Sequence, residues 1–86
     1  METSESKILK VRISSPDAVI WEGDAISVSS INSQGPFDIL PYHTNFITIV
    51  ENQPIKIHTP VKWEEFTYSN AIIYNRKNIV LIYTNI

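Results

Sequence analysis

The segment that decides the fold is GPFDILPYHTNFITIV, residues 35–50 of an 86-residue chain. It combines a turn, two prolines, a Tyr-His pair and an apolar strand. Polar residues between Asp38 and Thr44 lie on both sides of Pro41, and apolar residues typical of a core flank them. This arrangement predicts a rigid loop that is held out from a β-sandwich to contact another molecule.

Outside this segment, short runs of alternating apolar and polar residues dominate the chain. Leu9, Val11 and Ile13 show the alternation first, and its period of two is that of a half-buried strand. Strands are expected at residues 8–14, 18–21, 25–30, 46–50, 55–58, 61–68, 71–74 and 79–83. We expect the strand at 46–50 to be well buried, and residues 75–78 to form a four-residue polar hairpin loop.

Many short strands separated by turns predict an all-β fold. We expect a single antiparallel β-sandwich or flattened barrel of about eight to ten short strands. Residues 1–7 are expected to form a flexible N-terminal tail, and residues 8–86 one β-sandwich domain. A chain of this length suffices for one small domain only.

Composition and charge exclude several classes of function. The formal net charge of −2 gives no electrostatic footprint for nucleic acid or for anionic lipid. The absence of cysteine excludes disulfides and thiolate chemistry. No apolar run approaches the ~20 residues that span a bilayer, and the first seven residues lack the apolar core of a signal peptide. We expect a soluble cytoplasmic domain that can still sit on a membrane complex.

The sequence contains no pattern that predicts catalytic, cofactor-binding or metal-binding residues. His43 and His58 are too far apart to form a zinc motif, and two glycines cannot build a phosphate-binding loop. No serine lies in G-x-S-x-G. Glu64 and Glu65 should point to opposite faces of a strand and so cannot cooperate. A binding or structural role remains.

Histidines and aromatic residues leave some interpretations open. His43 fits a loop histidine that bonds to the backbone, or a contact residue at a protein interface. A small hydrolase that uses His43 with a nearby Ser or Asp is the weakest alternative. His58 should be a surface strand residue that faces the same way as Lys56. Core packing explains most of the larger aromatic residues, Trp21, Phe37, Phe46 and Phe66.

Residues 35–48 resemble the signature of the epsilon subunit of rotary F-type ATP synthases, which usually reads G-E-[FL]-G-I-[LY]-P-G-H-A-P-L-L-T. The matching positions are Gly35, Phe37, Ile39, Leu40, Pro41, His43 and Thr48. Weaker similarity on both sides extends the resemblance to about residues 8–84. The resemblance therefore covers nearly the whole chain.

The chain departs from this signature at several positions. Asp38 and Tyr42 replace glycines, Thr44-Asn45 replaces Ala-Pro, and Asn70 replaces a glycine near the last strands. If those glycines have positive φ, Tyr42 tolerates the conformation least. Pro36 occupies the place of an acidic residue, and Asp38 is our candidate to supply that charge.

The resemblance implies a non-catalytic subunit of the central stalk in a proton-translocating F-type ATP synthase. Such a subunit docks the gamma subunit to the c-ring and helps couple rotation to ATP synthesis. It lies peripherally on the cytoplasmic face of the cell membrane or of another energy-transducing membrane, and it needs no cofactor. The alternative is a free-standing β-sandwich module that binds a protein or a carbohydrate.

The resemblance also implies which residues contact partners, and each is inferred only from its position relative to the family pattern. The resemblance places Ser15 on a turn near gamma, and it places the motif of the opening segment near the ring and shaft. The candidate partner-binding residues are Ser15, Pro36, Asp38, Pro41, Tyr42, His43 and Thr44. Relatives commonly carry two C-terminal regulatory helices after the sandwich. Since the sequence stops at Ile86, we expect this regulatory arm to be missing.

Overall fold

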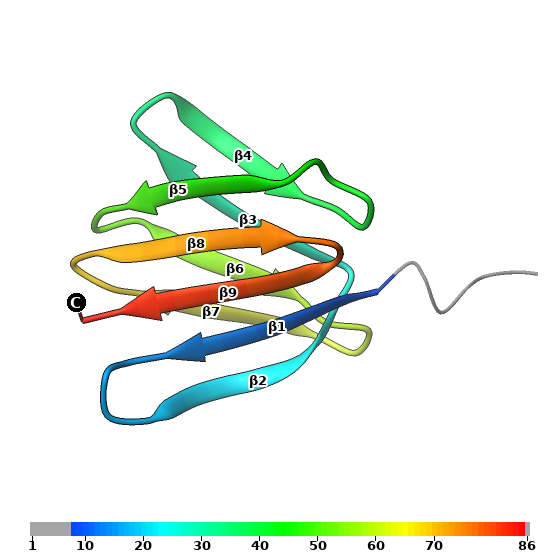
Figure 1. Ribbon diagram of the computed structural model, residues 1–86, viewed down its shortest axis with the longest axis horizontal. Coiled ribbons are helices and arrows are strands. Elements are labelled where there is room, and N and C mark those ends of the chain that lie inside the picture. Colours follow the sequence, from blue (N-terminus) through cyan, green and yellow to red (C-terminus); the bar gives the residue numbers. More distant parts are fainter. Residues whose placement is uncertain (1–7, 86) are drawn as a thin grey trace, which may run out of the picture.

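The alternating runs form nine β-strands and no helix in the computed structural model, which describes residues 8–85 (Figure 1). The strands are β1 (Leu9–Ser14), β2 (Val19–Ala25), β3 (Ser27–Asn32), β4 (Gly35–Ile39), β5 (Phe46–Val50), β6 (Pro54–His58), β7 (Trp63–Thr67), β8 (Ala71–Arg76) and β9 (Ile79–Thr84). The all-β prediction is confirmed. In the described part of the chain, no helix is long and apolar enough to cross a membrane. The tail predicted at residues 1–7 lies outside the described residues.

The strands form two sheets that pack face to face (Figure 1). The five-stranded sheet has the order β2-β1-β9-β8-β5, and the four-stranded sheet has the order β4-β3-β6-β7. All pairs are antiparallel except β1 with β9, which run parallel from Lys10↔Ile79 to Ser14↔Tyr83. A parallel pair needs a long connection between its strands, and here most of the chain provides it.

The core consists of aliphatic side chains from the inner faces of both sheets. Its members are Leu9, Val11, Ile13, Ala25, Val28, Ile39, Val50, Ile55, Ile57, Ala71, Ile73, Val80 and Ile82. They follow the period of two, because successive side chains of a strand point to opposite faces. Burial of this apolar surface is the main force that holds the sheets together.

Aromatic side chains pack around the aliphatic core and close the two open sides of the sandwich. On one side Trp21 of β2 meets Phe66 of β7, with ring centroids 6.1 Å apart. On the other side Phe37 of β4 meets Phe46 of β5 at 5.4 Å. Each pair joins an edge strand of one sheet to an edge strand of the other. The four aromatic residues predicted for the core are therefore half-buried at its margins.

Two details differ from the sequence predictions. The β8–β9 loop has two residues, Lys77 and Asn78, and both have positive φ (51° and 64°), as a type I′ hairpin turn requires. The predicted four-residue loop was wrong because the alternation of β8 continues through Asn75, which points inward and is buried. In β5, Ile47 and Ile49 point outward with 66% and 59% of their surface exposed. The prediction of a well-buried strand was therefore wrong for the outward face of β5, which carries these two residues.

Truncation of Phe66 tests whether the aromatic pairs close the sandwich. Phe66→Ala removes the ring contacts to Trp21 and Tyr68, and we expect it to lower the free energy of unfolding by about 2–3 kcal/mol, somewhat less than for a fully buried ring. The matched control is Thr67→Ala on the same strand, an outward-facing change expected to stay within about 0.5 kcal/mol. Urea unfolding followed by circular dichroism measures both. Equal effects of the two variants would contradict the assigned role of Phe66.

Candidate docking loop

Residues 40–45 connect β4 in one sheet to β5 in the other (Figure 1). The Leu40 carbonyl accepts a hydrogen bond from the His43 N–H at 3.0 Å, so residues 40–43 form a β-turn. Pro41 is the second residue of this turn, where its fixed φ is favourable. Tyr42 is the third residue and has a φ of 70°, which is the requirement of a type II turn. The loop predicted from the sequence is therefore real but shorter, because residues 35–39 form β4.

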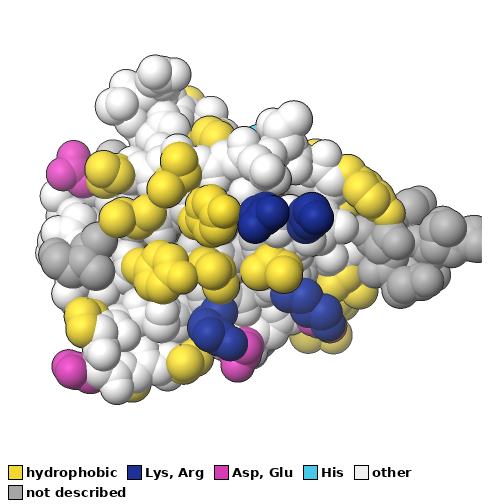
Figure 2. Space-filling view, in the orientation of Figure 1, with side chains coloured by type: hydrophobic (Ala, Val, Ile, Leu, Met, Phe, Trp, Pro, Cys, Tyr) yellow, Lys and Arg dark blue, Asp and Glu magenta, His cyan; other side chains and the backbone are white. Residues whose placement is uncertain are grey.

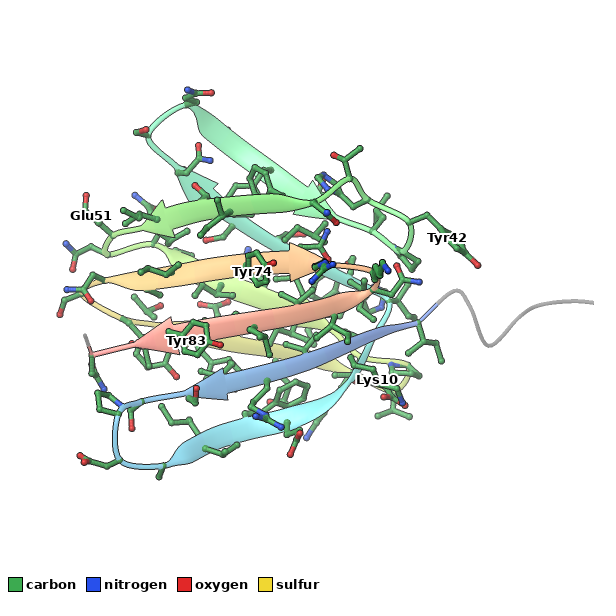
Figure 3. The ribbon with its side chains drawn as sticks, in the orientation of Figure 1. Lys10, Tyr42, Glu51, Tyr74 and Tyr83 are labelled. Atoms are coloured by element: carbon green, nitrogen blue, oxygen red, sulfur yellow. The ribbon has the colours of Figure 1, made fainter. Side chains whose placement is uncertain are left out.

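Tyr42 stands where the turn favours glycine, and the left-handed conformation costs a residue with a side chain roughly 1–2 kcal/mol. Neither Asp38 nor Asn70, which replace the other two glycines, has positive φ. The Tyr42 N–H donates a hydrogen bond to the Asn78 side-chain oxygen Oδ1 at 2.7 Å, which ties the loop to the β8–β9 hairpin. The Tyr42 side chain is 67% exposed and projects from the end of the sandwich (Figure 3).

The side chain of Asn75 in β8 holds the backbone of the loop by hydrogen bonds. Its side chain is buried on the inner face of β8. Its Nδ2 group donates hydrogen bonds to the carbonyls of Thr44 at 3.1 Å and His43 at 3.4 Å. Its Oδ1 atom has no hydrogen-bond partner among the described residues. The sequence predicts a turn at Asn75 and therefore misses its role in holding the loop. The signal that could have shown it is the alternation of β8, in which Ala71, Ile73 and Asn75 all point inward.

His43 is held by the backbone of its own loop. Its Nδ1 lies 2.8 Å from the Thr44 carbonyl oxygen, and Nδ1 must donate because a carbonyl only accepts. Its ring meets the Phe46 ring in an edge contact at 5.5 Å. This is the backbone-bonded histidine that the sequence left open. The contact gives the hydrolase interpretation no support, because it joins His43 to a carbonyl and to no nucleophile.

The structure brings only part of the predicted partner-binding residues together. Pro41, Tyr42, His43 and Thr44 share the loop at one end of the sandwich. Ser15 lies at the opposite end of β1 (Figure 1), where its hydroxyl oxygen accepts hydrogen bonds from the N–H groups of Asp17 and Ala18 at 3.3 Å.

Pro36 and Asp38 lie on β4, away from the loop tip. Pro36 pairs with Ile31 of β3 and follows Gly35, whose φ of 119° is one that other residues rarely adopt. Asp38 accepts a hydrogen bond from the Ser29 hydroxyl on the outer face of the four-stranded sheet. The seven predicted residues thus fall into three groups.

Exposed apolar residues lie at this end of the sandwich, and the loop residues 40–45 include no Lys, Arg, Asp or Glu. Leu40 lies in the loop, and Val61, which is 87% exposed, lies in the β6–β7 turn at the same end of the sandwich (Figure 1). The Thr59 hydroxyl orders that turn by accepting from the Lys62 N–H at 3.0 Å. Within residues 8–85, no three His, Asp or Glu side chains form a group that could hold a metal ion. The tip therefore has the chemistry of a protein contact.

Lys56 and His58 lie on one face of β6, as the sequence predicted. The His58 ring stacks on Trp63 of β7 with centroids 4.2 Å apart. Glu64 and Glu65 point to opposite faces, and Glu64 pairs with Lys62 at 3.3 Å. This region is a separate aromatic platform on the four-stranded sheet.

Comparison with known proteins places the chain among ATP synthase subunits. The family described as "ATP synthase, Delta/Epsilon chain, beta-sandwich domain" matches residues 8–86. The ATP synthase epsilon chain of Sulfurimonas denitrificans is 34% identical over 77 residues, which are 86% of this chain and 59% of that protein. The plastid epsilon chain of Prototheca wickerhamii is 30% identical over 78 residues, 91% of this chain and 58% of that protein. This chain thus spans a little under 60% of the length of both relatives.

Solved structures agree on the fold. A chain in the cryo-EM structure of the Euglena gracilis mitochondrial ATP synthase (OSCP/F1/c-ring) superposes with a TM-score of 0.81 at 13% identity. The match covers 92% of this chain and 51% of that one. A chain of the Tetrahymena thermophila central stalk/c-ring structure gives 0.73 at 11% identity, covering 88% and 62%. At such low identity these matches show the β-sandwich fold alone.

The support of the loop by Asn75 is testable by hydrogen exchange. Asn75→Leu keeps most of the volume but removes the hydrogen bonds to the loop carbonyls. We expect unfolding to become easier by about 1–3 kcal/mol, with faster amide exchange at residues 42–45. The control Arg76→Gln changes the neighbouring outward-facing side chain and should leave exchange in the loop unaltered. Unchanged exchange in Asn75→Leu would show that the loop holds its shape without Asn75.

Proposed function

This chain belongs to the family of β-sandwich domains of ATP synthase delta/epsilon chains, and from that premise we propose that it is a rotor subunit. In this role it is a non-catalytic part of the central stalk of a proton-translocating F-type ATP synthase. It docks a gamma subunit to the c-ring and thereby couples rotation to ATP synthesis. The family match over residues 8–86 carries the proposal.

The geometry of the docking loop supports a contact with the c-ring. Tyr42 combines an exposed ring with a backbone that is fixed by Pro41 and by the hydrogen bond to Asn78. Tyrosine is a frequent anchor at interfaces, and a prefixed loop loses little conformational entropy on binding. We assign the ring contact to Pro41, Tyr42, His43 and Thr44.

The remaining candidate residues have other roles in this proposal. Ser15, at the far end of β1, faces the gamma side. Asp38 supplies the carboxylate at the place where Pro36 has replaced an acidic residue. A hydrogen bond from the Ser29 hydroxyl fixes the orientation of this carboxylate.

The same proposal gives the protein a peripheral location on the cytoplasmic face of an energy-transducing membrane. Contact with the bilayer is indirect and runs through the c-ring. The net charge of −2 is consistent with attachment through protein partners, since a basic patch is the usual feature of direct binding to anionic lipid.

A double substitution in the loop tests the proposal. Purified chain should co-purify with the gamma subunit and c-ring of the same organism, and Tyr42→Ala with His43→Ala should weaken ring binding about tenfold or more. The fold should survive, because the Tyr42 side chain is exposed and the half-buried His43 ring lies beside Phe46, outside the aliphatic core. The matched control is His58→Ala with Trp63→Ala, an aromatic-histidine pair on the other sheet, which should change binding less than twofold.

Two results would contradict the proposal in different ways. Failure of the unmodified chain to recover either partner would reject the rotor role and favour the free-standing binding module. Equal binding by the loop variant and the control would retain the rotor role but reject the assigned loop.

A further inference from the structure

Each sheet of the sandwich ends in two edge strands, and β5 is the edge strand that differs from the others. The edges are β2 and β5 in the five-stranded sheet, and β4 and β7 in the four-stranded sheet. In Figure 1, β5 borders its sheet, and no strand of residues 8–85 continues the sheet beyond it. An edge strand presents backbone N–H and C=O groups without a partner in the sheet, so it can pair with a strand of another chain.

The edge strand β2 is protected against such pairing in two ways. Its register with β1 shifts between Ile13 and Ser14, so that Ile20 of β2 has no opposite residue. Such a bulge twists an edge away from a straight partner strand. The outward side chains Glu22 and Asp24 are also charged and exposed, and a partner strand would have to accommodate both charges. Pairing along β2 is therefore unfavourable.

Both edges of the four-stranded sheet are protected as well. Strand β4 contains Pro36, which has no N–H to donate to a partner strand, and it also carries the charged side chain of Asp38. Strand β7 carries Glu64 and Glu65. Proline and charged side chains are common means by which proteins prevent pairing at a sheet edge.

Strand β5 has none of these features. Its sequence, FITIV over residues 46–50, contains no charged residue, no proline and no glycine. Its register with β8 runs from Phe46↔Asn75 to Val50↔Ala71 without a bulge. Aromatic and β-branched residues, which favour strands, occupy all five positions. An apolar, regular and unprotected edge is the kind that pairs with another strand.

The surroundings of β5 are open. Ile47 and Ile49 point away from the core and are more than half exposed, and Figure 2 shows apolar side chains over β5 that continue onto β8 and β9. Where the end of β5 faces the β3–β4 hairpin there is a hollow of about 380 Å³, which is lined by Ile31, Asn32, Ser33, Ile49, Glu51 and Gln53. The hairpin therefore leaves room for another chain beside this end of β5.

The order of side chains in β5 identifies a second copy of the same strand as the partner. When two copies run antiparallel with Thr48 at the two-fold axis, Ile47 of each copy lies opposite Ile49 of the other. Phe46 then lies opposite Val50. Aliphatic residues meet aliphatic residues, threonine meets threonine, and these pairs stabilise antiparallel strands. Because β5 carries no charge, nothing in the strand repels its own copy.

We propose that two copies of the chain, in the absence of other proteins, pair through their β5 edges and join their five-stranded sheets into one continuous sheet. The contact has the two-fold symmetry that is commonest among homodimers. Five residues of β5 take part in each copy, fewer than the roughly 20–30 of a standard interface. The dimer is therefore transient, with a dissociation constant between about 10 μM and 1 mM.

Like charges on both sides of the two-fold axis test the pairing. Ile47→Lys with Ile49→Lys sets lysine against lysine at two places in the dimer, and like charges directly opposite each other destabilise a strand pair. We expect the dissociation constant to rise at least tenfold. Sedimentation velocity measures it, and circular dichroism checks that the exposed substitutions leave the fold intact.

The matched control is Ile72→Lys with Tyr74→Lys on the interior strand β8. Its two positions pair with the two tested positions of β5. It therefore adds the same charge to the same outward face, one strand away from the edge. We expect it to raise the dissociation constant less than threefold, because no lysine then faces another across the strand pair.

Disulfide crosslinking tests the register independently. Because the chain has no cysteine, a single introduced cysteine can bond only to another copy. Opposite residues of the proposed pair have their Cβ atoms about 5 Å apart, close to the distance that a disulfide spans. A mixture of Ile47→Cys and Ile49→Cys chains should therefore crosslink at least tenfold faster under mild oxidation than either variant alone. The control mixture of Glu65→Cys and Thr67→Cys, on the protected edge β7, should gain less than twofold.

Three results would overturn the inference. A chain that stays monomeric up to about 1 mM would reject the dimer. Equal weakening by the β5 and β8 lysine variants would place the contact on the outward face of the sheet and not at its edge. Equal crosslinking rates for the β5 mixture and its single variants would reject the antiparallel pairing. No gamma subunit or c-ring enters these experiments, so their results are independent of the proposed function.

Discussion

Contact between the inner faces of the two sheets is the interaction on which the rest of the structure depends. Aliphatic side chains from both sheets fill it, and a domain of this size buries a comparatively small fraction of the surface that its unfolded chain exposes. The aromatic pairs Trp21–Phe66 and Phe37–Phe46 close its two sides. Once this layer fixes which side chains point inward, the pleat of each strand fixes which ones point outward.

Asn75 is an exception within this layer, and the docking loop explains it. A polar side chain in the core is unfavourable unless it is hydrogen-bonded, and Asn75 bonds to two loop carbonyls. Together with Asn78, it lets one hairpin hold both the backbone of the loop and the left-handed Tyr42. The rigidity of the loop thus originates in β8 and β9, far from it in sequence.

The sequence predicted the fold class and, among the described residues, every strand except β4 (Gly35–Ile39), because the period of two is a local property. It placed residues 35–39 in the loop segment. It could not predict which face of β5 is covered, since Phe46, Ile47, Ile49 and Val50 are apolar on both faces. Residues 75–78 are a polar run between two apolar runs, so the sequence predicts a turn that includes Asn75. Pairing with Phe46 and Val80 and hydrogen bonds to the loop carbonyls hold it in a strand instead. The sequence also could not predict that Ser15 and Tyr42 lie at opposite ends of the sandwich, because their positions depend on how the strands are arranged in the sheets.

The parallel pairing of β1 with β9 has a consequence for the order of folding. Until residues 79–84 are available, β1 can pair only with β2, and the centre of the five-stranded sheet stays open. Contacts between residues so distant in sequence form slowly, because the intervening loop must close first. Strands β8 and β9, whose hairpin holds the docking loop through Asn75 and Asn78, belong to this last stage. During synthesis, the docking loop therefore acquires its fixed shape only when the whole domain can fold.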